Sequence, residues 1–331
     1  MLTSTILSEE KPALVAIPVT IAALAIAPSI LPESIGISLI TVLMYTILTL
    51  SWTMFSGPTG YISLATAGLF GVGVYVTAFL RDSLPIEAVV LLGGAAAFVV
   101  ALTIGLLTLR IKGVYFILFT FGVAALIRTS VQWWETHING TVGRHVIAAT
   151  NESVYLLLLI IFAITLVAAF LLRHASPGLA LLGIGENEDA AEHVGVNVTR
   201  LKVLTFAASS VLMGMTGAVM ATRFRYIDPS IAFNPLISFL PVLMAILGGV
   251  SKLYGPMIGA VILVALQEFL ITEYPYVYLL IFGLTLVVVV LWLPGGLVEL
   301  AQKGYFRLKI QWIKLRMRLT RFRRTRRAKR R

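Results

Sequence analysis

Long apolar runs recur along the whole chain, and they constrain its fold more than any other feature. A helix needs about 20 mainly apolar residues to cross roughly 30 Å of hydrocarbon. Ten segments approach this length: 13–31, 35–55, 62–80, 86–108, 114–133, 153–172, 203–222, 236–250, 256–271 and 277–294. The mean hydropathy of +0.95 and the 59% of hydrophobic residues are typical of membrane proteins. We therefore expect an all-α polytopic membrane protein with about ten transmembrane helices, within a range of about eight to ten.

Two parts of this pattern leave alternatives open. The eighth and ninth segments are short and interrupted by Gly and Pro, so they could form two spans, one long broken helix or a re-entrant pair. At the start, Glu9, Glu10 and Lys11 precede an apolar run that lacks an A-x-A-like end. This run is expected to be a retained first helix rather than a cleaved signal.

The positive charge of the chain is concentrated at its C-terminus. Residues 303–331 hold 14 of the 26 Lys and Arg residues and no acid, which leaves 12 basic against 15 acidic residues elsewhere. The sequence therefore divides into a transmembrane domain, 1–302, and a basic amphipathic tail, 303–331. The mixture of aromatic and basic residues in this tail would suggest nucleic acid in a soluble protein, but ten preceding helices argue against that. Apolar residues at three- and four-residue spacing, Phe306, Ile310, Ile313 and Met317, favour an interfacial helix bound to anionic lipid.

Short loops rich in Lys and Arg usually lie on the cytoplasmic side of a membrane. With ten crossings, the tail, the 110–112 loop and the 173–202 loop all fall on one side. Both termini are then cytoplasmic, in a plasma membrane. A minority of basic residues falls on the other side: Arg81, Arg144, Arg223 and Arg225.

The cytoplasmic loop 173–202 contains an unusual polar stretch, GIGENEDAAEHVGVNVTR, from Gly183 to Arg200. Pro177 and Gly178 are expected to stop the preceding helix, and ENEDAAEHV favours a short helix closed by Gly195. Such a helix could dock a cytosolic partner through its acids. It could equally be a solvated loop whose charges keep it out of lipid.

The polar stretch resembles the cytoplasmic coupling loop of ABC-importer permeases of the branched-chain amino acid family, nearest to the LivM-type subunit. The matching pattern is E-N-E-x-A-A-E-x-x-G-[IV]-N-V-x-R-x-K. The residues for the coupling loop are Glu186, Asn187, Glu188, Asp189, Ala190, Ala191, Glu192 and Gly195. GYISLATAGLFGVGVYVTAFL, LRIKGVYFILFTFGVAALIR, LMAILGGVSKLYGPMIGAVIL and WLPGGLVEL are similar to further motifs of that family, so the likeness spans about residues 57–300.

The resemblance implies a permease that forms a path for branched-chain or related amino acids. It implies two separate ATPase subunits that bind ATP and Mg²⁺, a second permease and an extracytoplasmic solute-binding protein. Urea or short amides are a second substrate class, because permeases for them resemble this family. A self-sufficient secondary transporter and a non-transporting scaffold remain alternatives.

The residues also indicate that this chain cannot bind and hydrolyse ATP without a partner. It contains no G-x-x-x-x-G-K-[ST] loop, no tight His spacing for a metal and no G-x-S-x-G elbow, so we expect no catalytic residue, bound cofactor or metal. Cysteine is absent, which excludes disulfides and thiolate chemistry.

Polar side chains within apolar segments are costly and mark candidate substrate contacts. The candidates are Ser63, Thr66, Tyr75, Arg128 and Asn234, with Gln132 and Glu268 as further suspects. Ser63 and Thr66 could instead cap the third helix, and Arg128 could snorkel to the surface. Relatives often carry an acid where Ala125 lies and more glycines in the 133–146 loop, and these differences bear on the substrate.

Glycines are expected to let helices approach closely at five positions. These are Gly68, Gly71, Gly73, Gly255 and Gly259. The stretches GPTGYISLATAGLFGVG and GGVSKLYGPMIGA are both interrupted by Gly and Pro, which is a pointer to a transport path at an inverted internal repeat. Their similarity is loose, so they support such a repeat only weakly.

Overall fold

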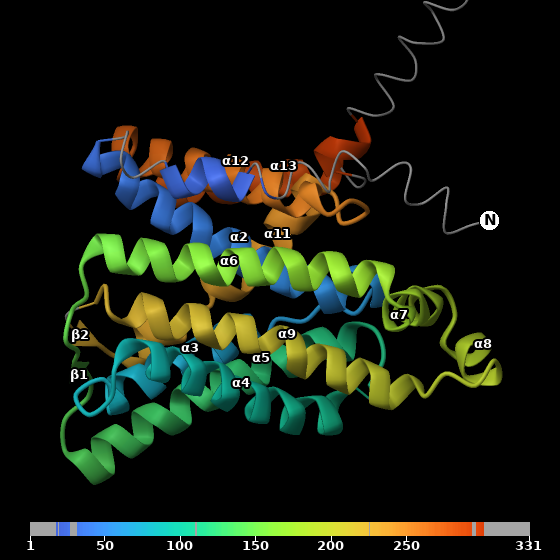
Figure 1. Cartoon of the computed structure of the whole chain (residues 1–331), viewed down its shortest axis with the longest axis horizontal. Coiled ribbons are helices and arrows are strands. Elements are labelled where there is room, and N and C mark those ends of the chain that lie inside the picture. Colours follow the sequence, from blue (N-terminus) through green and yellow to red (C-terminus); the bar gives the residue numbers. More distant parts are fainter. Residues whose placement is uncertain are drawn as a thin grey trace, which may run out of the picture.

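The protein is a bundle of apolar helices with one two-stranded sheet at one end (Figure 1). The computed structural model describes residues 18, 20–26, 32–109, 111–224, 226–292 and 296–300. Its long helices are α2 (Glu33–Thr59), α3 (Thr66–Leu80), α4 (Ile86–Thr108), α5 (Val114–Trp134), α6 (Asn151–His174), α9 (Val198–Ala221), α11 (Leu236–Gly248), α12 (Tyr254–Glu273) and α13 (Tyr278–Trp292). The short elements are η1 (Glu135–Asn139), β1 (Arg144–His145), α7 (Ser176–Glu186), α8 (Glu188–His193), β2 (Tyr226–Ile227) and α10 (Pro229–Ala232).

Seven spans in the described part of the chain are long and apolar enough to cross a membrane, which makes this an all-α polytopic membrane protein. They lie in α2, α4, α5 with η1, α6, α9, α10 with α11, and α12. The expected ten are not reached among these residues. The predicted segments 62–80 and 277–294 correspond to helices of only 15 residues, α3 and α13. Segment 13–31 lies mostly outside the described residues, as do Arg110, Arg225 and the tail 303–331.

The third predicted segment is short because residues 60–65 are not helical. Gly60 ends α2 with a φ of 70°, and residues 61–65 have no regular secondary structure before α3 begins at Thr66. Backbone groups buried in a bundle need partners, and distant side chains supply them here. The Trp52 Nε1–H donates to the Ser63 carbonyl over 2.8 Å, and the Ser238 hydroxyl donates to the Leu64 carbonyl over 2.7 Å. Such a bond also reaches the first turn of α3, where the Ala67 N–H donates to the Ser238 hydroxyl over 2.9 Å.

Close helix contacts occur at glycines in both halves of the chain. A Cβ on Gly73 of α3 would lie 1.9 Å from the Gly214 carbonyl oxygen of α9. A Cβ on Gly259 of α12 would lie 1.9 Å from the Met244 carbonyl oxygen of α11. Gly68, Gly71 and Gly255 also face a neighbouring element within 3.3 Å. Small residues let helix backbones pack at distances that a larger side chain would prevent.

Helices α11 and α12 are separate, joined by a turn at residues 249–253. The alternative of one broken helix is therefore wrong, and the ninth segment is longer than predicted, since α12 has 20 residues. The re-entrant pair stays an alternative. The sixth predicted segment, 153–172, corresponds to α6, which ends at His174, before Pro177 and Gly178. These two residues begin α7 instead of only stopping α6, because Pro is well tolerated in a first helical turn.

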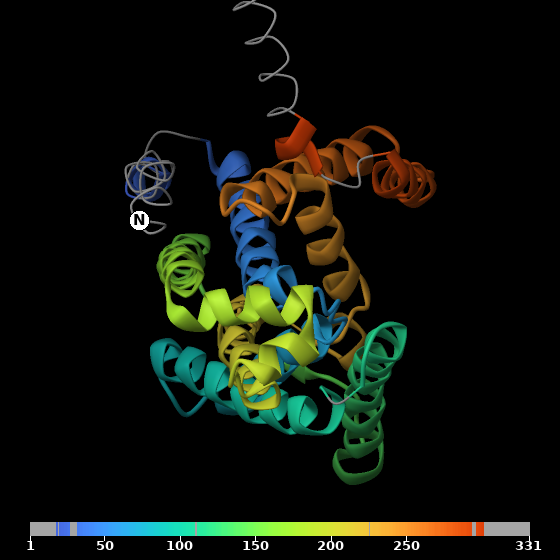
Figure 2. The ribbon, with the colours of Figure 1, turned by 90° about the vertical axis from the view of Figure 1, so that its right-hand side faces the viewer.

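The two ends of the bundle differ. Helices α7 and α8 lie at one end, and the sheet of β1 and β2 lies at the other (Figure 1). Viewed from the first end, α7 and α8 lie across the ends of the long helices (Figure 2). The α7–α8 end is called the inner end below, and the β1–β2 end is called the outer end.

Candidate functional site

The polar stretch folds into a compact unit at the inner end. The Asn187 side chain accepts a hydrogen bond from the Ala190 N–H over 3.1 Å and so caps α8. The predicted short helix is present, and Gly195 follows it with a φ of 90°. Below it, Leu181, Ile184, Ala191 and Val198 form a small apolar core that fixes α8 on α7 and α9.

Glu188 of α8 points into the protein. Its carboxylate lies 2.7 Å from the Lys112 Nζ, pairs with the Lys202 Nζ and accepts a hydrogen bond from the Tyr61 hydroxyl over 2.9 Å. The Lys202 side chain is only 3% exposed. Burial raises the pKa of Glu188, but the hydrogen bonds from the two lysines and Tyr61 outweigh it, so the pKa lies below its ordinary value. The carboxylate thus joins α8 to three other segments.

The other acids of the stretch face outward. The Asp189 side chain is 85% exposed, and Glu186 and Glu192 are also exposed. Ala191 is buried, so it cannot contact a partner directly. The polar stretch therefore has two faces, one bound to the bundle and one carrying accessible acids.

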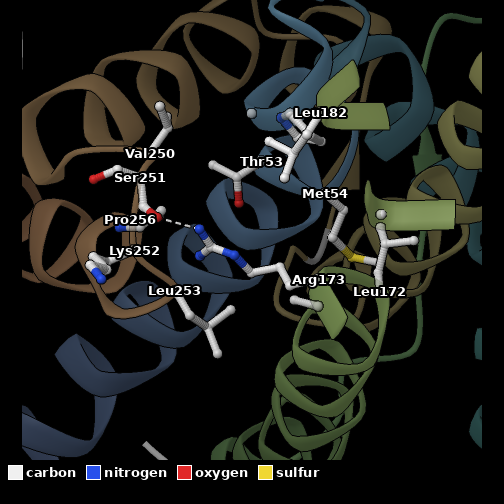
Figure 3. Close-up of a pocket in the computed structure, with 14 residues that line it drawn as sticks. Thr53, Met54, Leu172, Arg173, Leu182, Val250, Ser251, Lys252, Leu253 and Pro256 are labelled. Atoms are coloured by element: carbon white, nitrogen blue, oxygen red, sulfur yellow. Dashed lines mark hydrogen bonds between the residues drawn. The ribbon is translucent and has the colours of Figure 1, made fainter. Parts of the chain in front are cut away.

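A second inner feature lies between α6, α7 and the α11–α12 turn. A cavity of about 340 Å³ separates them, lined mainly by apolar side chains. Figure 3 shows the Arg173 guanidinium reaching across this cavity to donate a hydrogen bond to the Ser251 carbonyl. This contact joins the end of α6 to the turn before α12.

Most of the predicted substrate contacts are packed inside the bundle. Ser63, Thr66 and Tyr75 are 4%, 1% and 6% exposed, and Tyr75 stacks on Phe233 with ring centres 5.5 Å apart. The Ser63 hydroxyl lies 3.3 Å from the Ala65 N–H, and Thr66 is the first residue of α3 rather than its cap. Asn234, by contrast, lines a cavity of about 700 Å³ near the outer end.

Arg128 lies apart from that cavity. It is half-buried near Asp228, and the two groups attract each other. The pKa of Asp228 is below its ordinary value. Burial alone would raise it, but hydrogen bonds from Ser230 and Ile231 and the nearby Arg128 charge lower it by more.

A buried acid at the outer end was not among the residues that the sequence suggested. Glu135 begins the π-helical turn η1, and its side chain is fully buried. One oxygen accepts a hydrogen bond from the Gly143 N–H over 2.9 Å, and the other lies 4.0 Å from the Arg144 Nε. Arg144 also lies over the Phe79 ring, 4.0 Å from its centre. The only signal in the sequence was an acid directly after the apolar α5.

None of the described residues forms a cluster of three or more His, Cys, Asp or Glu side chains that could hold a metal ion. The polar stretch at the inner end and the cavity lined by Asn234 at the outer end are the two candidate sites. Their chemistry is that of charge pairing and polar contacts in a membrane helix bundle.

Comparison with known proteins places this architecture in a family. Residues 34–290 match the family described as branched-chain amino acid transport system / permease component. The chain is 23% identical over 303 residues to the high-affinity branched-chain amino acid transport system permease protein LivM of Salmonella typhimurium, covering 81% of this chain and 71% of LivM. It is 23% identical over 283 residues to LivH of the same organism, covering 76% and 90%.

Sugar permeases match a shorter part of the chain. The xylose transport system permease protein XylH of Haemophilus influenzae is 30% identical over 114 residues, which cover 33% of this chain and 30% of XylH. No solved structure matches the chain. The family match covers most of the sequence, and the helices that it includes are those of a multi-pass membrane protein. The chain therefore belongs to the family of branched-chain amino acid ABC permease components.

Proposed function

We propose that this chain is the membrane-spanning permease subunit of a binding-protein-dependent importer, forming a path for branched-chain or related amino acids. Separate ATPase subunits power it, bind ATP and Mg²⁺, and dock on α7 and α8. The observation that carries this proposal is the two-faced polar stretch. Asp189 offers an accessible acid, while Glu188 beside it is tied to Lys112 and Lys202 of other segments.

This arrangement would transmit a movement of the docked ATPase subunits to the helix bundle. A partner that moves α8 must also move the segments bound to Glu188, because breaking a buried ion pair leaves an uncompensated charge. Lys202 lies in the first turns of α9, whose candidate span is 78% buried in the bundle. Closure of the ATPases around nucleotide would therefore tilt α9 and alter access along the bundle.

The remaining partners follow from the relatives. LivM and LivH are both named as permease proteins of one kind of transport system, so we propose a second permease beside this chain. A solute-binding protein would deliver cargo at the outer end, and the termini would lie with α7–α8 in the cytoplasm. The tail 303–331 would bind anionic lipid, with no nucleic acid involved. Urea or short amides remain the second substrate class.

A single cysteine tests the docking surface, because the chain has none of its own. Asp189→Cys, in membranes that contain the ATPase subunits, should cross-link to one of them, and the yield should change with ATP. Tyr276→Cys is the matched control, since this fully exposed residue lies in the α12–α13 turn at the outer end. We expect no cross-link from it.

A secondary transporter predicts a different result. It would give no ATPase cross-link from Asp189→Cys, and the chain alone would drive uptake with an ion gradient. That pair of outcomes would overturn the proposed function.

A further inference from the structure

The outer cavity combines two opposite charges with an apolar wall. Helices α2, α3, α9, α11, α12 and α13, with α10, enclose its volume of about 700 Å³. Arg223, which directly follows α9, and Glu268 of α12 both line it. Met44, Phe70 and Val264 supply apolar wall. Cavities of roughly 300–1,000 Å³ accommodate small molecules.

Arg223 and Glu268 lose favourable contact with water in this position. Both side chains are half-buried, and charged groups within a membrane bundle normally have a partner or a functional role. In the described part of the chain, no ion pair of 4.0 Å or less joins Arg223 to Glu268 or to another acid. The two groups share a cavity without neutralising each other directly.

We infer that this cavity is a binding site for a zwitterionic solute, held at its carboxylate by Arg223 and at its ammonium by Glu268. Arginine suits the first contact because its planar guanidinium can donate two parallel hydrogen bonds to a carboxylate. The aliphatic part of the solute lies against Met44, Phe70 and Val264. This inference rests on the proposed function, since the bound solute is the cargo of the importer.

Asn234 adds a polar side chain in a fixed position, which helps to orient the bound solute. Its side-chain oxygen accepts a hydrogen bond from the Leu236 N–H over 3.0 Å, which fixes the residue at the start of α11. Asn234 therefore lines the cavity from a position set by the backbone, as do Arg223 and Glu268 from other elements. A solute bound there touches α9, α11 and α12 together, so relative movement of these helices releases it.

The test uses the complete importer in proteoliposomes, with leucine as the probe and the binding protein at saturation. Arg223→Gln and Glu268→Gln should each lower the initial uptake rate about tenfold or more, because each removes a charged hydrogen-bond partner. Arg223→Lys and Glu268→Asp should retain more uptake than the neutral variants. The thermal unfolding temperature of the complex should stay unchanged, which shows that the variants fold.

Matched controls come from the same end of the molecule. Arg81→Gln and Glu273→Gln change the same residue types outside the cavity and should leave uptake within about twofold of the wild type. If the wild-type complex takes up leucine and the Arg223 and Glu268 variants match these controls, the site is refuted while the importer stands. A wild-type complex without ATP-dependent leucine uptake refutes the proposed function and, with it, this site.

Discussion

At the scale of single residues, Glu188 is the most tightly constrained group of the inner end. It pairs with Lys202, which is 3% exposed, so Glu188→Gln should leave a buried charge that retains Tyr61 but has no opposite charge beside it. We expect a loss of about 3 kcal/mol in unfolding free energy, and a similar loss for Lys202→Met. The double variant should lose clearly less than the sum of the two, because both charges are then absent. Thermal unfolding of the purified protein, read as a double-mutant cycle, measures this coupling.

Asp189→Asn is the control for that cycle. Its side chain is 85% exposed and 3.8 Å from Lys112, so its removal should change stability by no more than about 0.5 kcal/mol. Strictly additive losses for the Glu188 and Lys202 variants would show that the pair does not hold α8 to α9.

At the scale of helices, Gly73 limits how closely α3 and α9 can pack. A Cβ there would lie 1.9 Å from a backbone oxygen, which cannot rotate away, so Gly73→Ala should force the helices apart. We expect a destabilisation of about 1–3 kcal/mol. Gly122→Ala in α5 is the matched control, because no atom lies within 4 Å of its added Cβ. Alanine favours a helix over glycine by about 1 kcal/mol, so this variant should be neutral or more stable. If thermal unfolding shows that Gly73→Ala is no more destabilising than Gly122→Ala, the close contact between α3 and α9 is contradicted.

The same scale shows how far the sequence could predict the structure. The apolar run 86–108 coincides with α4, because hydrophobic length alone sets the ends of a simple span. The start of α3 at Thr66 was missed, since the hydrogen bonds to the non-helical residues before it come from Trp52 and from Ser238, which is far away in sequence. The short helix that contains Glu188 was predicted correctly from ENEDAAEHV. The inward direction of Glu188 depends on Lys112, 76 positions earlier, and no local pattern contains that information.

At the scale of the whole molecule, α9 connects the two candidate sites. It begins beside the Glu188 cluster and is followed directly by Arg223 in the outer cavity, and it packs on α2, α3, α4 and α6 between them. A buried helix of 24 residues moves largely as one body, so a displacement of α8 should reach the cavity. Spatial continuity alone does not demonstrate such coupling, and a measurement at the far site is needed.

A cysteine at Gln267 provides that measurement, because this residue lines the outer cavity. In the complete importer, the rate at which a membrane-impermeant thiol reagent labels Gln267→Cys should change at least severalfold when ATP is bound. Adding Glu188→Gln should remove most of this dependence, because α8 is then no longer bound to Lys202 by charge. Tyr276→Cys, fully exposed in the outer α12–α13 turn, should label at one rate in every condition. An ATP response that survives Glu188→Gln would mean that motion reaches the cavity by a route other than the Glu188–Lys202 pair and α9.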